Sequence, residues 1–369
     1  MSSYIQSIGI ANPGDRISQD HILGFMQKAH ALNKQDSIRL QALYRATGIK
    51  YRYSVIPDYH QVENSFYPPT ENLEPFPTIE NRMKVYQDNA LGLAKAAISD
   101  CFSQLHLQDY ASVTHLITVS CTGMYAPGLD IELIESLGLS PSTERTSINY
   151  MGCYAAFNAI KIGNSICQSN PNAVILILCI ELCSIHFQKK PDNDNLLANA
   201  LFGDGAAALV QSSLPLGTVK LEPVKFHCDL IPNGKEEMAW NIGNFGFEMK
   251  LSSYVPEVIK TGVKQLSDRL LEKLPLDLSE IDYFAPHPGG KRILEVIEDE
   301  LQLTRKQNQY AFEILRNYGN MSSPTVLFVL KKILEDFRTG SLSESYVLSI
   351  AFGPGLTLES MILRLTRNQ

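Results

Sequence analysis

Apolar and polar residues follow two patterns along this chain. Short runs rich in β-branched and small apolar residues predict buried strands. We expect strands at residues 5–11, 115–121, 173–182, 206–211, 281–286, 346–352 and 356–363. Longer segments with apolar residues three and four positions apart predict helices. We expect helices at residues 18–32, 37–47, 79–105, 154–168, 253–274, 290–301 and 324–337. Strands that alternate with helices indicate an α/β fold.

Two parts of the chain repeat the same order of features. The motif Phe-Gly-x-Gly stands at residues 202–205 before one predicted strand, and at residues 352–355 before another. This repetition predicts two similar α/β halves that pack around a pseudo-twofold axis. We place the N-terminal half at residues 1–214 and the C-terminal half at residues 215–369.

Four chemically reactive or polar residues occur at corresponding points of the repeat. Cys121 ends one predicted strand, 32 residues before Cys153, and His287 ends another, 33 residues before Asn320. Strand ends and helix N-termini are where α/β folds bind ligands. We therefore expect these four residues to converge on one cleft.

Composition excludes several classes of protein. The chain has 369 residues, 44% of them hydrophobic and 19% charged, which is typical of a globular protein. The formal charge of −7 argues against a nucleic-acid partner. Seven cysteines without a C-x-x-C motif, and no signal peptide or apolar run long enough to span a membrane, favour a cytoplasmic protein with free thiols.

Cys153 is the candidate nucleophile. It follows Gly152 and begins an almost wholly apolar predicted helix, so its thiol is expected at the positive end of the helix dipole. Such a position lowers the pKa of a thiol. For the other six cysteines we expect the commonest fate of the residue type, which is packing in the core.

His287 and Asn320 are the candidate partners of Cys153. His287 lies between prolines and glycines that fix its direction at a strand end, and a histidine beside a cysteine can form an imidazolium–thiolate pair. Considered alone, the position of Asn320 is typical of a turn or helix-capping residue. Its amide becomes catalytic only if it meets the other two side chains.

The order Cys, His, Asn also occurs in papain-like hydrolases, and the gap of 134 residues between Cys153 and His287 fits that class. The C-G-[SA]-C-[WY] signature of those enzymes is absent, and the repeated Phe-Gly-x-Gly motif has no role there. This hydrolase stays open as a distant alternative.

Five segments together resemble the type III polyketide synthases, the chalcone and stilbene synthase-like family of the thiolase superfamily. They are M-G-C-Y-A-A at 151–156, L-F-G-D-G-A-A-A at 201–208, H-P-G-G at 287–290, Y-G-N-M-S-S at 318–323 and F-G-P-G-L-T at 352–357. The resemblance covers essentially the whole chain. It implies a duplicated thiolase fold with five layers, αβαβα, and a homodimer.

The resemblance also implies a reaction. Cys153 resembles the nucleophile that takes a starter acyl group from coenzyme A as a thioester. His287 and Asn320 resemble the pair that binds the thioester carbonyl and stabilises the enolate formed when malonyl-CoA loses carbon dioxide. Two fixed N–H donors in a dry pocket stabilise such a developing charge. The substrates implied are malonyl-CoA and an acyl-CoA starter, and neither a metal nor another cofactor is needed.

Further site residues follow from the same resemblance. Phe202 and Phe247 resemble two gatekeepers between the coenzyme A tunnel and the cavity. The other substrate-binding residues implied are Cys121, Thr122, His186, Met238, Ser322, Gly353, Pro354 and Gly355. The basic residues Arg39, Arg45, Lys50 and Arg52 lie in the region where the family binds coenzyme A phosphates.

The sequence departs from the plant enzymes at the cavity. The segment 121–128 is two residues shorter than the plant pattern and resembles bacterial members, with Ala126 in place of an intersubunit methionine. His186 replaces a small threonine. Loss of the methionine side chain suggests a tunnel for a fatty acyl starter, giving alkylpyrones or alkylresorcinols, whereas His186 would shrink the pocket.

Two further alternatives concern proteins with the same three residues. A ketoacyl synthase III-like enzyme of fatty-acid synthesis shares them, but carries H-Q-A-N where this chain has H-P-G-G at 287–290. A catalytically inactive homologue acting as a scaffold is difficult to reconcile with the presence of all three.

Overall fold

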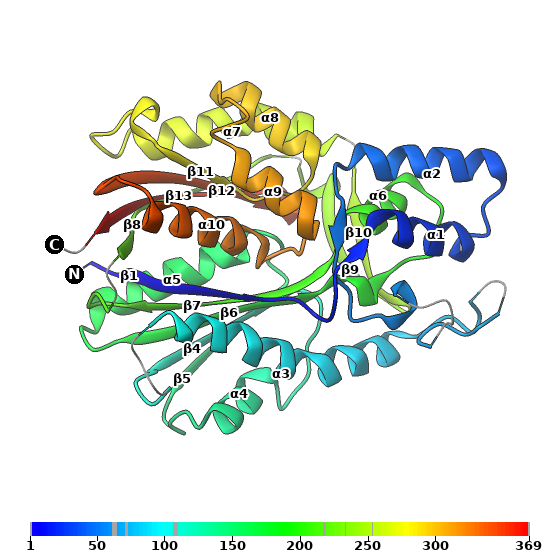
Figure 1. The fold of residues 1–369 in the computed structure, drawn as a ribbon, viewed down its shortest axis with the longest axis horizontal. Coiled ribbons are helices and arrows are strands. Elements are labelled where there is room, and N and C mark those ends of the chain that lie inside the picture. Colours follow the sequence, from blue (N-terminus) through cyan, green and yellow to red (C-terminus); the bar gives the residue numbers. More distant parts are fainter. Residues whose placement is uncertain are drawn as a thin grey trace.

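The computed structural model of the protein describes residues 2–60, 65–70, 73–105, 110–216, 219–232, 234–252 and 254–367. Figure 1 shows two stacked sheets with helices between them and on both outer faces. The strands are β1 Tyr4–Ala11, β2 Ile17–Ser18, β3 Tyr51–Arg52, β4 His115–Ser120, β5 Glu144–Asn149, β6 Val174–Leu182, β7 Asp204–Ser212, β8 Val219–Leu230, β9 Met238–Gly243, β10 Gly246–Leu251, β11 Tyr283–Pro286, β12 Glu344–Gly353 and β13 Thr357–Arg367.

The helices cover and separate these sheets. They are α1 Gln19–Ala29, α2 Lys34–Ala46, α3 Ile79–Ser103, α4 Leu129–Leu137, α5 Ala155–Ser169, α6 Asn193–Leu201, α7 Val255–Leu271, α8 Lys291–Leu301, α9 Gln309–Tyr318 and α10 Thr325–Thr339. Short 3₁₀ helices are η1 Pro57–Tyr59, η2 Cys183–His186, η3 Gly234–Glu236, η4 Leu278–Glu280 and η5 Pro354–Leu356.

The two sheets repeat one topology. In the N-terminal half, β4 runs parallel to β6, which is followed across the sheet by antiparallel β7 and β1. In the C-terminal half, β11 runs parallel to β12, which is followed by antiparallel β13 and β8. A single pair, Ile5 with Leu221, joins β1 to β8. The repetition confirms the predicted duplicated fold, and β5 is an additional strand at the N-terminal edge.

Five layers follow from this arrangement. Helix α3 packs on the outer face of the first sheet, and α7 packs on the outer face of the second. Helices α5 and α10 lie between the sheets, where α5 contacts β6, β7 and β13, and α10 contacts β1, β7 and β11. A helix in this middle layer must be apolar all round. The buried residues of α10 from Thr325 to Leu330 satisfy that requirement.

Each predicted strand and helix has a counterpart in the structure, with ends that differ by a few residues. Cys121 falls just beyond β4, and the predicted helix at 253–274 is α7, which starts at Val255; Ser253 lies outside the described residues. The sequence analysis missed the strands β2, β3, β5, β8, β9 and β10 and the helices α4, α6 and α9. Residues 217 and 218, beside the expected boundary between the halves, also lie outside the described part, and the division at 214/215 remains our proposal.

Candidate active site

One cavity brings the candidate residues of both halves together. It has an empty volume of about 980 Å³, part of which is open to solvent. Cys121, Cys153, His287 and Asn320 all line it, which is the convergence expected from the repeat. Phe202, Phe247, Thr122, His186, Met238, Ser322, Pro354 and Arg52 line it as well.

Cys153 stands at the turn that leads into α5, two residues before the first helical residue. The preceding Gly152 has a φ of +82°, and a Cβ there would lie 2.3 Å from Cδ of Pro354. Glycine at 152 therefore lets the turn that presents the thiol pack directly against the loop of the second Phe-Gly-x-Gly motif.

The thiol of Cys153 is buried and neutral. Burial raises its pKa to about 11, against the smaller lowering effect of hydrogen bonding to Ser322 and Asn320. The expectation of a lowered pKa from the helix dipole is therefore wrong for the free protein. Desolvation of the charged thiolate by burial is the largest contribution to this raised pKa.

His287 follows β11, and its backbone N–H donates to the carbonyl of Ile350 at 2.7 Å. The ring is completely buried, and neither nitrogen has a hydrogen-bond partner among the described residues. Burial lowers the pKa of His287 to about 3. An imidazolium–thiolate pair with Cys153 is therefore not the state of the free protein; the imidazole is neutral and carries one unused N–H.

Hydrogen bonds to the backbone hold the side-chain amide of Asn320. Its Oδ1 accepts from the backbone N–H of Ser322 at 2.8 Å and lies 4.0 Å from Sγ of Cys153. Its Nδ2 donates to the carbonyl of Gly289 at 3.2 Å. Because an amide nitrogen carries two hydrogens, one N–H of Asn320 remains for a ligand.

A buried carboxylate that the sequence analysis missed lies behind the site. Glu181, near the end of β6, accepts from the backbone N–H of Cys121 at 2.9 Å, from Oγ1 of Thr122 at 2.7 Å and from Oγ of Ser323 at 2.6 Å. Burial raises its pKa to about 7. The one charged residue in the apolar run 173–182 was the available signal.

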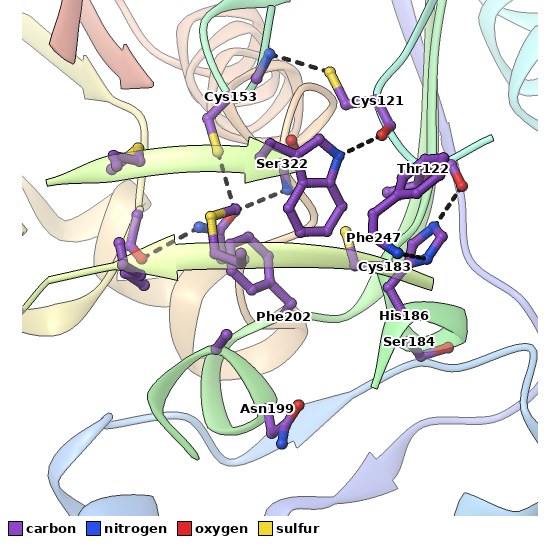
Figure 2. Close-up of a pocket in the computed structure, with 18 of the residues that line it drawn as sticks. Cys121, Thr122, Cys153, Cys183, Ser184, His186, Asn199, Phe202, Phe247 and Ser322 are labelled. Carbon is purple, nitrogen blue, oxygen red and sulfur yellow. Dashed lines mark hydrogen bonds between the residues drawn. The ribbon is translucent and has the colours of Figure 1, made fainter. Parts of the chain in front are cut away.

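Three aromatic rings form a rigid wall of the cavity. His186 stacks on Phe247 at 4.2 Å between ring centroids, and Trp240 meets both rings edge-on. His186 Nε2 lies 2.6 Å from the carbonyl of Thr122, and its Nδ1 accepts from the backbone N–H of Phe247 at 2.9 Å (Figure 2). These two bonds fix the tautomer with hydrogen on Nε2. Trp240, which was not foreseen, donates to the carbonyl of Cys121 at 2.7 Å.

The remaining predicted wall residues differ in position. Phe202 and Met238 line the cavity, and so do Met249 and Leu251 of β10, which the sequence analysis did not single out. Gly353 and Gly355 are not among its described lining residues. Gly353 instead approaches the backbone of the active-site turn, since a Cβ there would lie 3.4 Å from the backbone nitrogen of Cys153.

The four basic residues do not form one group. Arg52 is buried and donates to the side chain of Gln19 and to the carbonyls of Asn199 and Phe202. Arg39, Arg45 and Lys50 are exposed and lie outside the described lining of the cavity. The coenzyme A role of the four residues remains a prediction.

A second, largely apolar cavity adjoins the first. It has an empty volume of about 750 Å³ between α2, α6, α7 and α8. Leu251, Gly289 and Ile293 line both cavities. Lys291 and Arg292 line the second one. The two cavities therefore share part of one wall, and cationic side chains lie at the second.

The described part of the chain has neither a helix that could span a membrane nor a metal-binding cluster. No helix there is both long and apolar enough to cross a bilayer. No cluster of three or more His, Cys, Asp or Glu side chains there is arranged to hold a metal ion.

The fold and the Cys, His and Asn at one cavity define a condensing acyltransferase with a thiolase-like fold. Two family models cover nearly the whole chain: the chalcone and stilbene synthase N-terminal domain matches residues 2–215, and the C-terminal domain of the same family matches residues 224–366. The chain therefore belongs to the chalcone and stilbene synthase family and is a type III polyketide synthase.

Individual relatives agree with this. The chain is 32% identical over 295 residues to an alpha-pyrone synthesis polyketide synthase-like protein, Pks18, of Mycobacterium tuberculosis, covering 79% of this chain and 74% of that one. It is 30% identical to probable polyketide synthase 1 of Dictyostelium discoideum, covering 98% of this chain but only 11% of that much longer protein. The crystal structure of PKS-I from the brown alga Ectocarpus siliculosus superimposes with a TM-score of 0.90 at 28% identity, covering 100% of this chain and 98% of that chain.

Proposed function

We propose that this enzyme loads an acyl-CoA starter onto Cys153 and extends it with malonyl-CoA, using His287 and Asn320 to stabilise the enolate. The observation that carries the proposal is that these three buried side chains line one cavity, with Asn320 beside the thiol. His287 and Asn320 each keep an N–H that no described residue of the protein uses.

The steps balance without a cofactor. The Cys153 sulfur attacks the starter carbonyl, the C–S bond to coenzyme A breaks, and the thiol proton passes to the leaving coenzyme A sulfur. Malonyl-CoA then loses carbon dioxide, and the electron pair of the broken C–C bond forms an enolate whose oxygen the two N–H donors hold. The enolate carbon attacks the Cys153 thioester, which forms a C–C bond and releases the cysteine sulfur for the next extension.

The adjoining cavity is the proposed route for the coenzyme A thioester. Its apolar walls suit the pantetheine arm, and exposed Arg45 and Lys50 together with Lys291 and Arg292 provide cations for the phosphates. Arg52 is left out of this group because it is buried and its Nε and Nη1 already donate to internal acceptors.

The product class that the wall favours is a pyrone. The ring cluster of His186, Phe247 and Trp240 restricts the cavity on one side. A relative named for alpha-pyrone synthesis is 32% identical to this chain over 295 aligned residues. Ala126 is exposed and outside the described cavity lining. A fatty acyl tunnel at Ala126 therefore depends on an approaching second subunit.

We propose a homodimer formed at the β5 edge. Four consecutive residues of β5 from Glu144 to Ser147 are exposed, and this strand is the free edge of the sheet. Met124, 44% exposed, lies in the loop after the neighbouring strand β4.

The free thiols, six of them buried, fit the cytoplasmic location expected from the sequence.

Incubation with malonyl-CoA and starters from acetyl to long-chain and aromatic acyl-CoA, followed by mass analysis of the products, tests the proposal. We expect carbon dioxide release and a starter-containing polyketide that is absent with Cys153→Ala. A single condensation that stops at a β-ketoacyl thioester on a carrier protein would favour the ketoacyl synthase alternative, and absence of turnover with every starter would overturn the proposal.

A further inference from the structure

Glu181 joins the two halves of the protein behind the cavity. Its strand β6 belongs to the N-terminal half, and its two carboxylate oxygens accept hydrogen bonds from different halves. Oε2 accepts from Cys121 and Thr122, which follow β4, whereas Oε1 accepts from Ser323, which precedes α10. The carboxylate is completely buried, and no cation of the described residues lies within ion-pair distance of it.

Each loop that Glu181 holds touches one element of the catalytic machinery. Sγ of Cys121 accepts from the backbone N–H of Gly152 at 3.1 Å, next to Cys153, and Figure 2 shows this bond beside the nucleophile. Ser322, the neighbour of Ser323, donates its backbone N–H to Oδ1 of Asn320 at 2.8 Å. Glu181 is thus connected through two hydrogen bonds, by way of Cys121, to the turn that carries Cys153. It is likewise connected, by way of Ser323 and Ser322, to the amide of Asn320.

The three donors favour a charged carboxylate at Glu181. All three groups donate to Glu181, and the hydroxyl of Thr122 also accepts from the backbone N–H of Leu182 at 2.9 Å, so its hydrogen is committed to Glu181. A glutamine side chain would place an NH₂ against donors at one of the two sites. A buried carboxylate without a cation is costly, and it is justified only where several donors converge on it.

We propose that Glu181 is a positioning residue for both starter loading and malonyl-CoA decarboxylation. It holds the turn at Cys153 and the loop at Asn320 in a fixed position relative to each other across the interface between the halves. The proposal deepens the function given above and rests on it for the reaction. Loading of the starter and decarboxylation of malonyl-CoA should therefore decline together when Glu181 is changed, although Glu181 itself contacts neither substrate.

The test compares three variants. Glu181→Gln removes the charge, Glu181→Asp keeps the charge but shortens its reach, and Ser323→Ala removes only the donor on the Asn320 side. Loading is measured as acyl-Cys153 formed in a single turnover, and decarboxylation as carbon dioxide released in a Cys153→Ala background. Glu359→Gln is the matched control, because Glu359 is also buried but pairs with Lys161 at 2.7 Å away from the cavity lining.

We expect Glu181→Gln and Glu181→Asp to lower both rates at least tenfold with little change in KM, and Ser323→Ala to lower decarboxylation more than loading. Glu359→Gln should leave both rates near those of the wild type. Folded Glu181 variants with both rates unchanged, or with only one rate lowered, would overturn the proposal. If neither glutamate variant folds, Ser323→Ala decides, since equal rates to wild type in that variant contradict the role.

A separate readout needs no substrate. The negative charge of Glu181 contributes to the raised pKa of Cys153, so the midpoint of Cys153 alkylation by iodoacetamide should move to lower pH in Glu181→Gln and stay in place in Glu181→Asp. An unmoved midpoint in Glu181→Gln would contradict the placement of the charge beside the site. A wild type that released no carbon dioxide would refute the proposed function and leave this readout intact.

Discussion

Phe202 and Asn320 are joined by an isolated parallel β-bridge across the two halves of the protein. The backbone N–H of Gly203 donates to the carbonyl of Asn320, and the N–H of Asn320 donates to the carbonyl of Leu201, each at 2.9 Å. Phe202, which resembles a gatekeeper, and Asn320, whose amide we propose to bind the enolate, are therefore held by one backbone element. Changes to either side chain leave the bridge itself intact.

This bridge predicts different outcomes for the two side chains. Phe202→Ala removes a cavity ring but keeps the backbone bonds that place Asn320, so carbon dioxide release from malonyl-CoA should stay within a few-fold of wild type. Product formed per carbon dioxide should fall, because the enolate is less well confined. Asn320→Ala removes a donor to the developing oxyanion and should lower carbon dioxide release by roughly 10²–10³-fold. Equal losses in the two variants would contradict this division of roles.

Gly152 allows a second comparison. Gly152→Ala forces a Cβ to within 2.3 Å of Pro354 at a φ of +82°, whereas Gly138→Ala meets nothing within 4 Å at a similar φ of +66°. The strained backbone alone costs about 1 kcal/mol. We expect Gly138→Ala to lower the free energy of unfolding by about that amount and to load starter normally.

Gly152→Ala should lose more stability than Gly138→Ala and should also lose acyl-Cys153 formation, because relief of the clash moves the turn that carries the thiol. Urea denaturation and single-turnover loading measure the two effects. A Gly152→Ala protein that matched Gly138→Ala in both measurements would show that the loop at Pro354 moves aside without further loss of stability or of starter loading.

The sequence predicted the architecture well because the buried elements carry strong apolar patterns. Strands such as β6 and β7 are buried along nearly their whole length, so their composition alone separates them from loops. By contrast, β5 has one buried residue in six, and the β9–β10 hairpin pairs only with itself. Such elements depend on contacts with other parts of the chain, which local composition does not reveal.

The spacing of residues in the sequence predicted which side chains meet at the cavity, but it did not predict their ionisation states. A helix start at Cys153 argued for a lowered pKa, and the depth of burial that reverses the shift depends on the loop at Pro354 and on the C-terminal half. The same applies to Glu181, whose three donors come from segments that lie 60 residues before it and 142 residues after it. Long-range packing sets the local dielectric, and sequence-local reasoning does not contain it.

The raised pKa of Cys153 predicts the reactivity of the free enzyme. Only the thiolate is alkylated, so carbamidomethylation of Cys153 should keep rising with pH towards about 11 and should be slow at pH 7.5. Exposed Cys228 serves as an internal reference in the same mass-spectrometric measurement. Ser322→Ala removes a hydrogen bond that lowers the pKa of Cys153 and should shift the profile to higher pH. A rate that levels off below pH 8 would contradict the neutral thiol.

His186 predicts how stability depends on pH. Burial lowers its pKa to about 3 in the folded protein, from an ordinary value near 6.5 in the unfolded chain. Between these values the unfolded chain binds more protons, so the contribution of neutral His186 is complete above pH 6.5 and is lost as the pH falls. Lowering the pH from 7 to 5 should reduce the free energy of unfolding by about 2 kcal/mol through this residue alone.

Denaturation of wild type and His186→Phe at both pH values isolates that contribution, because other titrating groups cancel in the difference. His186→Phe should be less stable at pH 7, since Thr122 and Phe247 lose their bonds to the imidazole, yet it should lose about 2 kcal/mol less than wild type on acidification. His21→Gln, at an exposed position of α1, is the control and should follow the wild-type pH dependence. Parallel curves for wild type and His186→Phe would mean that the imidazole takes up its proton as easily in the folded cavity as in the unfolded chain.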